Sequence, residues 1–307
     1  MEYVILDLEW NGTYSRKKKG FINEIIEFGA VKCDEALSVV STFSSLVRPQ
    51  VGKKISGKVK TLTSITNEEL ASGRQFMQVQ SRFRKWMGEA VLLTWGTSDI
   101  LTLIENYRYF CGSEKIPFLT GYVDLQKYCE DVMEYGSAQQ MGLSTAAQLL
   151  EIDEEGMDHH RALDDSLLSL KCLKKLYDRE RLNGYIQDAL RQEFYDKVQF
   201  KTVIISDLHH PLIRRGDLLF RCESCGKMAR RLEPWTLRNK SFRAPFECRS
   251  CHHRFVGRVQ FKLKYEGLVV KKGIYPWQEK EKKKETDSAA KAAETVPSEN
   301  KGENLTG

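Results

Sequence analysis

Runs of apolar and β-branched residues define the strands expected in the first 178 residues. The pattern predicts four strands, at 3–10, 24–33, 38–48 and 91–95. Helical periodicity follows after 99, after 124 and from 161. Strands with helices between and after them predict a mixed sheet covered by helices, which places this region in the α/β class.

The remaining residues predict a second, smaller domain and two flanking segments. Residues 179–200 read as a continuing helix that connects the domains, with Gly184 as the place where it could break. Residues 201–277 predict a small β-rich module, with early strands at 203–205 and 218–220. Residues 278–307 carry Lys and Glu runs with almost no large apolar residue, so this tail is expected to be disordered.

Asp7 and Glu9 are two acids inside the first apolar run, which the polar pair Asn11-Gly12 is expected to end. Side chains of a strand alternate between faces, so the two carboxylates point the same way. Inside a sheet they would repel each other and lose hydration, and a divalent cation would compensate for both costs. The alternative is a strand edge whose acids point into water.

Two later stretches supply further acids and two histidines. Residues 92–99 predict a buried strand and a turn, with Asp99 at the start of a helix. Residues 156–165 place a His five positions before an Asp at the start of an amphipathic helix, in two possible registers. On a helical wheel Asp165 lies at the margin of the apolar stripe and Asp164 on the solvent side. We therefore expect His160 with Asp165, and read His159 as a loop residue.

In this order, the motifs resemble the DEDDh family of 3′→5′ exonucleases, the DnaQ-like and ribonuclease T-like group. The resemblance covers roughly residues 1–178 and implies a ribonuclease H-like fold. Residues 62–66, Leu-Thr-Ser-Ile-Thr, are similar to the family's Thr-Gly-Ile-Thr loop, with Ser64 in place of the usual Gly.

The resemblance implies phosphodiester hydrolysis with two divalent cations, Mg²⁺ or Mn²⁺. Asp7 would contact both cations, Glu9 and Asp165 would hold the one that carries the attacking water, and Asp99 would act on the other largely through water. Because a histidine pKa lies near neutrality, His160 is the expected general base.

The same resemblance places the terminal nucleotide beside the residues that follow Asp7 and Glu9. The expected substrate-binding residues are Trp10, Asn11, Gly12, Leu62 and Thr63. Trp-Asn-Gly departs from the family's more usual Thr-Thr-Gly, which leaves the base and sugar preference open. Trp10 could equally belong to the core.

Four of the eight cysteines form two tight pairs, and the others are scattered through apolar segments. Two Cys-x2-Cys knuckles predict one structural Zn²⁺ in a zinc ribbon, held by Cys222, Cys225, Cys248 and Cys251. Two disulfides are the alternative, which a cytoplasmic setting disfavours. Four thiolates complete a tetrahedron, so we read His252 and His253 as surface or nucleic-acid-facing residues.

Positive charge is concentrated in the zinc-ribbon region. Residues 214–272 carry 16 Lys or Arg against five acids, whereas the whole chain has a net charge of +6. Aromatic residues are interleaved with these basic residues; we expect most to be core and one or two to be exposed. A surface of this kind indicates nucleic acid as the partner.

The sequence thus predicts a metal-dependent 3′→5′ exonuclease for single-stranded ends, with RNA the expected substrate ahead of DNA. The alternatives are a single-stranded DNA exonuclease of the proofreading or repair type, and a non-catalytic nucleic-acid-binding regulatory protein. No apolar run approaches the roughly 20 residues of a membrane span, and no signal-peptide pattern is present. We expect a cytoplasmic protein, and the family resemblance allows a homodimer.

Overall fold

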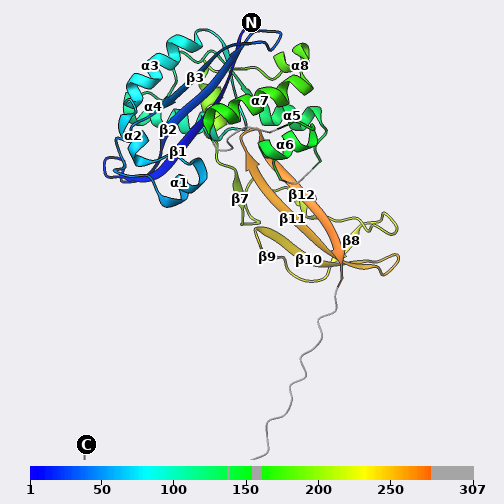
Figure 1. The fold of residues 1–307 in the computed structure, drawn as a ribbon. Coiled ribbons are helices and arrows are strands. Elements are labelled where there is room, and N and C mark those ends of the chain that lie inside the picture. The colour runs from blue at the N-terminus through cyan, green and yellow to red at the C-terminus, as the bar shows by residue number, and fades with distance from the viewer. Residues whose placement is uncertain (137–138, 154–160, 278–307) are drawn as a thin grey trace, which may run out of the picture. The chain divides into compact units, whose positions relative to one another are not determined.

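A computed structural model of the protein describes residues 1–136, 139–153 and 161–277. Its fold divides into two compact units, the first over Met1–Lys201 and the second from Thr202 on (Figure 1). The predicted disordered tail, 278–307, lies outside the described residues. No helix in the described part of the chain is long and apolar enough to cross a membrane.

The first unit is built on a mixed six-stranded sheet. Its strands are β1 (Tyr3–Ser15), β2 (Gly20–Cys33), β3 (Val39–Leu46), β4 (Val91–Thr94), β5 (Gly121–Asp124) and β6 (Gln187–Asp188). They lie in the order β3-β2-β1-β4-β5-β6. β1 pairs antiparallel with β2 and parallel with β4, and β4 and β5 are parallel. The predicted mixed sheet with helices packed against it is confirmed.

Alternating side chains of β1 divide between two hydrophobic cores. Val4, Leu6 and Leu8 face a core shared with α3 (Phe76–Met87) and α4 (Ser98–Cys111). Tyr3 and Ile5 face a second core. The helices of that core are α5 (Leu125–Val132), α6 (Leu143–Leu149) and α7 (Ala162–Leu176). Asp7 and Glu9 continue the second series, so they lie on the face of the sheet that carries α7.

Two short helices and a long hairpin complete this end of the first unit. α1 (Gly57–Thr63) and α2 (Asn67–Ser72) pack around a small cluster of Ile26, Ile55, Ile65 and Leu70.

The expectation that Asn11 ends the first strand was wrong. β1 continues to Ser15 because Asn11 pairs with Glu24 and the ladder with β2 runs on to the turn.

The prediction of one connecting helix over 179–200 was also wrong. The segment forms α8 (Arg179–Asn183), β6 and α9 (Gln192–Gln199), and α8 ends at Gly184. β6 pairs with β5, and the α9 residue Tyr195 is fully buried in the first core. Pairing with the sheet edge and burial of α9 therefore make these residues part of the first unit.

The second unit is a β-rich domain. Its elements are β7 (Val203–Ile205), a 3-10 turn η1 (Arg215–Leu218), β8 (Ala229–Arg231), β9 (Thr236–Arg238), β10 (Ser241–Cys248), β11 (Arg254–Lys264) and β12 (Gly267–Pro276). The main path is β12-β11-β10-β8, with β7 beside β11 and β9 beside β10. The early strand at 203–205 is confirmed. The one expected at 218–220 is wrong: Leu218 ends η1, and Phe220 is buried in the core.

One face of the second sheet forms the core of this unit. Its buried aromatic residues are Phe220, Phe242, Phe246, Phe255 and Phe261. Trp235 packs on them at its margin, while Tyr265 and Tyr275 are exposed. The expectation that most of the interleaved aromatic residues are core is confirmed.

Candidate active site and metal centres

Three of the predicted acidic ligands converge at one place in the first unit. Each of Asp7, Glu9 and Asp165 offers a carboxylate oxygen, and these atoms lie within 4.8 Å of one another. Asp7 and Glu9 come from β1, and Asp165 from the first turn of α7. Asp164 is not in this group, so the structure favours the register with Asp165. Three carboxylates so close form a hard oxygen donor set suited to a divalent cation.

A glycine allows α7 to approach the sheet at this point. Gly29 lies directly opposite Asp7 in the β1–β2 ladder. A Cβ atom built on Gly29 would lie 2.0 Å from backbone atoms of Ala162 and Leu163. The hydroxyl of Ser166 donates to the Gly29 carbonyl at 2.8 Å. The start of α7 therefore rests directly on the backbone of β2, which brings Asp165 to Asp7.

The carboxylates of this cluster destabilise one another's ionised forms. Burial raises the pKa of Asp7 well above its usual value, and the charges of Asp99 and Asp165 raise it further. Burial, then the charges of Asp165 and Glu27, raise the pKa of Glu9 to about 8. A bound cation would offset both the cost of burying the charges and the repulsion between them.

Asp99 is buried and lies close enough to Asp7 for its charge to act on that carboxylate. It stands in the first turn of α4, is 4% exposed, and accepts a hydrogen bond from the Leu8 amide at 3.0 Å. Burial raises its pKa to about 7, although that hydrogen bond opposes the shift. Its charge acts on Asp7, but its carboxylate is not within the 4.8 Å group. This position is compatible with the water-mediated role that the resemblance implies.

Glu27 and Arg161 form an ion pair at the site that the sequence reasoning missed. Glu27 lies directly opposite Glu9 in the ladder and is 2% exposed. The Arg161 guanidinium donates to both of its carboxylate oxygens, at 2.7 and 3.3 Å. The signal in the sequence was an acid inside the apolar run 24–33, since an acid buried there needs a partner.

The predicted substrate-binding residues occupy several environments. Trp10 packs partly buried against the first core, on the opposite face of β1 from Asp7 and Glu9. Asn11 is buried, and its side-chain oxygen accepts the Ser56 amide at 3.0 Å. Thr63 is buried and its hydroxyl donates to the Val59 carbonyl. These contacts hold the local backbone, and a substrate contact for the three residues stays a prediction.

Leu62 and Gly12 are exposed, so both are accessible for the predicted contact with the substrate. Ser64, which replaces the family's usual Gly, has a φ of 58° and caps α1 in the left-handed conformation. The loop thus keeps the backbone that a glycine would adopt most readily. His159 and His160 lie outside the described residues.

Comparisons with known proteins show the family of the first unit. Residues 4–173, just over half of the chain, match the model of a protein family that is described as exonuclease. The chain belongs to this exonuclease family. It is 32% identical over 177 residues to the "Probable 3'-5' exonuclease KapD" of Bacillus subtilis (strain 168), covering 56% of this chain and 82% of that protein. It is 26% identical over 159 residues to the human "3'-5' exoribonuclease 1", covering 48% of this chain but only 44% of that protein.

Solved structures show the same fold for this exonuclease domain. One is described as "3'-end specific recognition of histone mRNA stem-loop by 3'-exonuclease", with a TM-score of 0.51 and 22% identity, covering 62% of this chain and 68% of that one. Another is the nuclease domain of 3'hExo, a DEDDh family member bound to rAMP, with a TM-score of 0.50 and 23% identity, covering 61% and 96%. The ribonuclease H-like fold expected from the sequence is confirmed.

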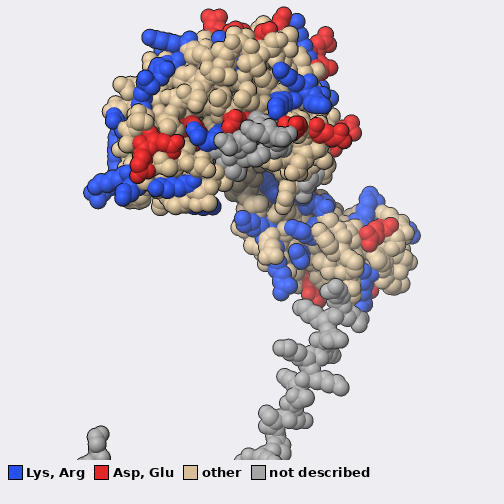
Figure 2. Space-filling model, viewed as in Figure 1, with Lys and Arg blue, Asp and Glu red and all other residues tan. Residues whose placement is uncertain are grey.

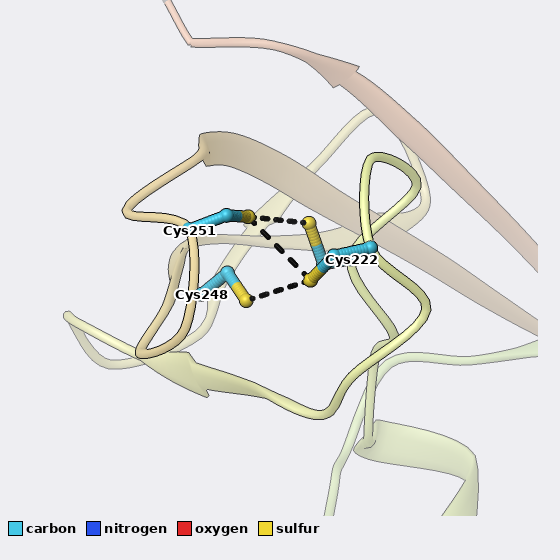
Figure 3. A group of neighbouring side chains, drawn as sticks. Cys222, Cys248 and Cys251 are labelled. Atoms are coloured by element: carbon cyan, nitrogen blue, oxygen red, sulfur yellow. Dashed lines mark hydrogen bonds between the residues drawn. The ribbon is translucent and has the colours of Figure 1, made fainter.

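A second candidate metal centre lies outside the exonuclease domain. The sulfur atoms of Cys222, Cys225, Cys248 and Cys251 all lie within 4.8 Å of one another. Figure 3 shows the side chains of Cys222, Cys248 and Cys251, which converge from two loops. The closest sulfur pairs are 3.4 to 3.5 Å apart, far beyond the roughly 2.05 Å of a disulfide bond. All four are free thiols, so the arrangement fits tetrahedral coordination of a metal ion.

The two knuckles repeat one backbone conformation. The Gly226 amide donates to the Cys222 carbonyl, and the His252 amide donates to the Cys248 carbonyl, each at 2.8 Å. Gly226 and His252 have φ values of 71° and 55°. Amide groups of Cys251 and Ser250 lower the pKa of the Cys248 thiol to about 6. Such amide hydrogen bonds favour the thiolate form that a metal requires.

Proposed function

We propose that the protein is a metal-dependent 3′→5′ exonuclease that removes nucleotides from single-stranded 3′ ends, with RNA ahead of DNA. Membership of the exonuclease family supplies the class of reaction, hydrolysis of phosphodiester bonds. The observation that carries the proposal is the convergence of Asp7, Glu9 and Asp165, together with the buried Asp99, whose charge acts on Asp7. An acidic cluster of this kind has no stabilising value in the sheet unless it binds cations.

Mg²⁺ or Mn²⁺ ions bound there would activate a water molecule and stabilise the charge that develops on the phosphate. The protein's own part is to hold the acids in place. β1 fixes Asp7 and Glu9 on one face, and α7 delivers Asp165 to the same face. The Leu8 amide orients the Asp99 carboxylate. His160 is proposed to accept the proton of the attacking water.

The preference for RNA is supported by what the relatives are called. The human relative is named an exoribonuclease, and one structural neighbour is described with a histone mRNA stem-loop. DNA is the second candidate, because other relatives are DNA polymerase III proteins of the PolC type. The polymerase relative from Staphylococcus haemolyticus is 26% identical over 168 residues, which cover only 10% of its length.

The second unit is proposed to be a zinc-ribbon module beginning near residue 201, and the exonuclease domain to occupy the preceding residues. Cys222, Cys225, Cys248 and Cys251 would hold one Zn²⁺ with no open coordination position. Neither His252 nor His253 belongs to this group of four ligands. A closed site of this kind is structural and supports the fold around it.

Digestion of matched 5′-labelled single-stranded RNA and DNA oligonucleotides tests the proposal. The enzyme is assayed with Mg²⁺, with Mn²⁺ and without added divalent cations, beside an Asp7→Asn variant. A metal-dependent ladder that shortens from the 3′ end is expected, with RNA cleaved faster. Faster cleavage of DNA would reverse the preference. Intact oligonucleotides under every condition would instead support a nucleic-acid-binding protein without turnover.

A further inference from the structure

The strands of the second sheet carry an extreme charge ratio. Strands β7 to β12 contain ten Lys or Arg residues and a single acid, Glu247. On the side of the second unit that Figure 2 shows, basic side chains spread widely among few acidic ones. Glu247 is already paired with Arg254, at 3.0 Å. The remaining positive charge on the sheet has no acidic partner within these strands.

Alternation sorts these side chains to one face of the sheet. In β10 every second residue from Phe242 to Cys248 faces the hydrophobic core, and in β11 every second residue from Phe255 to Phe261 does so. The residues between them point to the opposite face. We call this the basic face and define it by Arg243, Arg254, Arg258, Lys262, Lys271 and Tyr275, which the strand registers place on the same side.

Two arginines face each other at the centre of the basic face. Arg243 of β10 lies directly opposite Arg258 of β11. Like charges in directly opposed positions destabilise a sheet. The Arg243 Nε atom is buried and has no hydrogen-bond partner among the described residues. A bound anion would offset the repulsion between the two arginines, since a guanidinium group pairs well with a phosphate.

An aromatic ring lies beside this arginine pair. Tyr275 of β12 is 46% exposed, and its hydroxyl accepts a hydrogen bond from Arg258 at 3.3 Å. Its ring lies against Gly273, where a Cβ atom would stand only 3.1 Å from it. The glycine thus leaves room for the ring to lie over the strand. An exposed aromatic ring next to guanidinium groups can stack a base while the arginines bind phosphates.

We propose that the basic face binds single-stranded nucleic acid, with Arg243 and Arg258 on backbone phosphates and Tyr275 stacked on a base. The inference rests on the proposed function in one respect, namely that the bound strand is the substrate of the exonuclease domain. Binding itself requires no turnover, so it can be measured separately from cleavage.

The test compares two double variants that each remove two positive charges. Arg243→Gln/Arg258→Gln alters the basic face. Arg215→Gln/Lys227→Gln is the matched control, because both residues are exposed and lie outside the strands of the sheet. Binding of a fluorescent single-stranded 20-nucleotide probe is measured without divalent cations, using the full-length, zinc-containing protein over a range of salt concentrations.

The basic-face variant is expected to lose affinity by at least about tenfold, and the control by less than about twofold. The slope of log affinity against log salt should shrink by about 1.4 in the basic-face variant, roughly 0.7 for each lost phosphate contact. Tyr275→Leu should weaken binding while leaving the slope unchanged. Equal losses in the two double variants, or equally tight binding of poly-glutamate by the parent protein, would overturn the inference.

Thermal unfolding separates a binding role from a structural one. Removing two opposed like charges should leave the melting temperature of the basic-face variant unchanged or raised. If the melting temperature falls, the variant Arg243→Lys/Arg258→Lys provides a second test because it keeps both charges. It is expected to retain the parent's slope of log affinity against log salt. A smaller slope in this variant would also overturn the inference. A parent protein that cleaves, with variants that bind normally, refutes only this inference. A parent that binds without cleaving refutes only the proposed function.

Discussion

Arg161 holds the carboxylate of Glu27 with two hydrogen bonds, Nη2 to Oε1 at 2.7 Å and Nε to Oε2 at 3.3 Å. The Ala162 amide adds a third, to Oε2 at 3.3 Å. The pair thereby ties the middle of β2 to the residue that precedes α7, one turn before Asp165. It also places a positive charge beside Glu9 that opposes the rise in the Glu9 pKa.

Arg161→Ala is expected to destabilise the protein and impair cleavage, because it leaves Glu27 buried without its partner. Losing one member of a buried ion pair costs roughly 3–5 kcal/mol, and the partial exposure of Arg161 favours the lower end of that range. Denaturant unfolding measures the loss. The double variant Arg161→Gln/Glu27→Gln should recover most of the stability. A double variant as unstable as Arg161→Ala would argue against this account.

Asp165→Asn should lower kcat by about 10³-fold, since a lost cation ligand removes several kcal/mol of transition-state stabilisation. Asp164→Asn is the matched control, one residue away on the same helix, and should keep activity within about twofold of the parent. Steady-state cleavage of a labelled oligonucleotide provides the measurement. The opposite ranking would mean that the alternative register, with His159 and Asp164, forms the site.

His160→Ala is expected to reduce kcat by about 10²–10⁴-fold, the usual contribution of a general base, while leaving substrate affinity nearly unchanged. The acidic limb of the pH–rate profile should change in the same variant. His159→Ala is the control and should behave like the parent. Equal effects of the two substitutions would rule out a distinct role for His160.

The pH dependence of stability should report on Glu9. Its folded-state pKa, about 8, lies above the ordinary value of 4.5, so the folded protein binds a proton that the unfolded chain releases in this window. Without divalent cations, the free energy of unfolding should therefore fall as the pH rises from about 5 to about 8. Mg²⁺ should reduce this fall. Glu9→Gln should make this fall shallower and reduce the effect of Mg²⁺, with the remainder coming from Asp7 and Asp99, whose pKa values are also raised. Glu68→Gln, an exposed control, should change neither the fall nor the effect of Mg²⁺.

The purified, reduced protein should contain about one zinc per chain. Cys248→Ser should lose that zinc and the cooperative unfolding of the second unit, because a structural zinc contributes directly to folding. Cys111→Ser, at a partly buried cysteine of the first unit, is the control and should keep the metal. Elemental analysis after gel filtration gives the ratio, and a zinc-free protein with an unchanged melting curve would remove the assignment.

The acids could be predicted because their chemistry is local in the sequence. Strand alternation alone places Asp7 and Glu9 on one face, and a helical wheel separates Asp165 from Asp164. The two Cys-x2-Cys knuckles could be predicted in the same way, because a spacing of two residues allows both cysteines to bind one metal ion. The sequence could not predict how deeply each group is buried, such as the burial of Asp99.

The failures came where tertiary contacts decide the structure. Residues 179–200 carry a helical pattern, but pairing of β6 with the sheet edge and burial of Tyr195 divide the segment. β1 runs past Asn11 because β2 pairs with it, which no turn signal within β1 reveals. Glu27 went unnoticed since its role depends on Arg161, more than 130 positions away in the chain.

Gly29 has no side chain that could hold a cation, yet the spacing of the acids depends on it. With the backbone of Ala162 and Leu163 only 2.0 Å from where its Cβ would lie, even Gly29→Ala must lift the start of α7 off the sheet. Asp165 would move away from Asp7 without any change in charge. Such a variant would fold around an intact set of ligands and still bind cations poorly. The distance between β2 and α7 therefore limits cation binding at the proposed site, and an uncharged residue sets that distance.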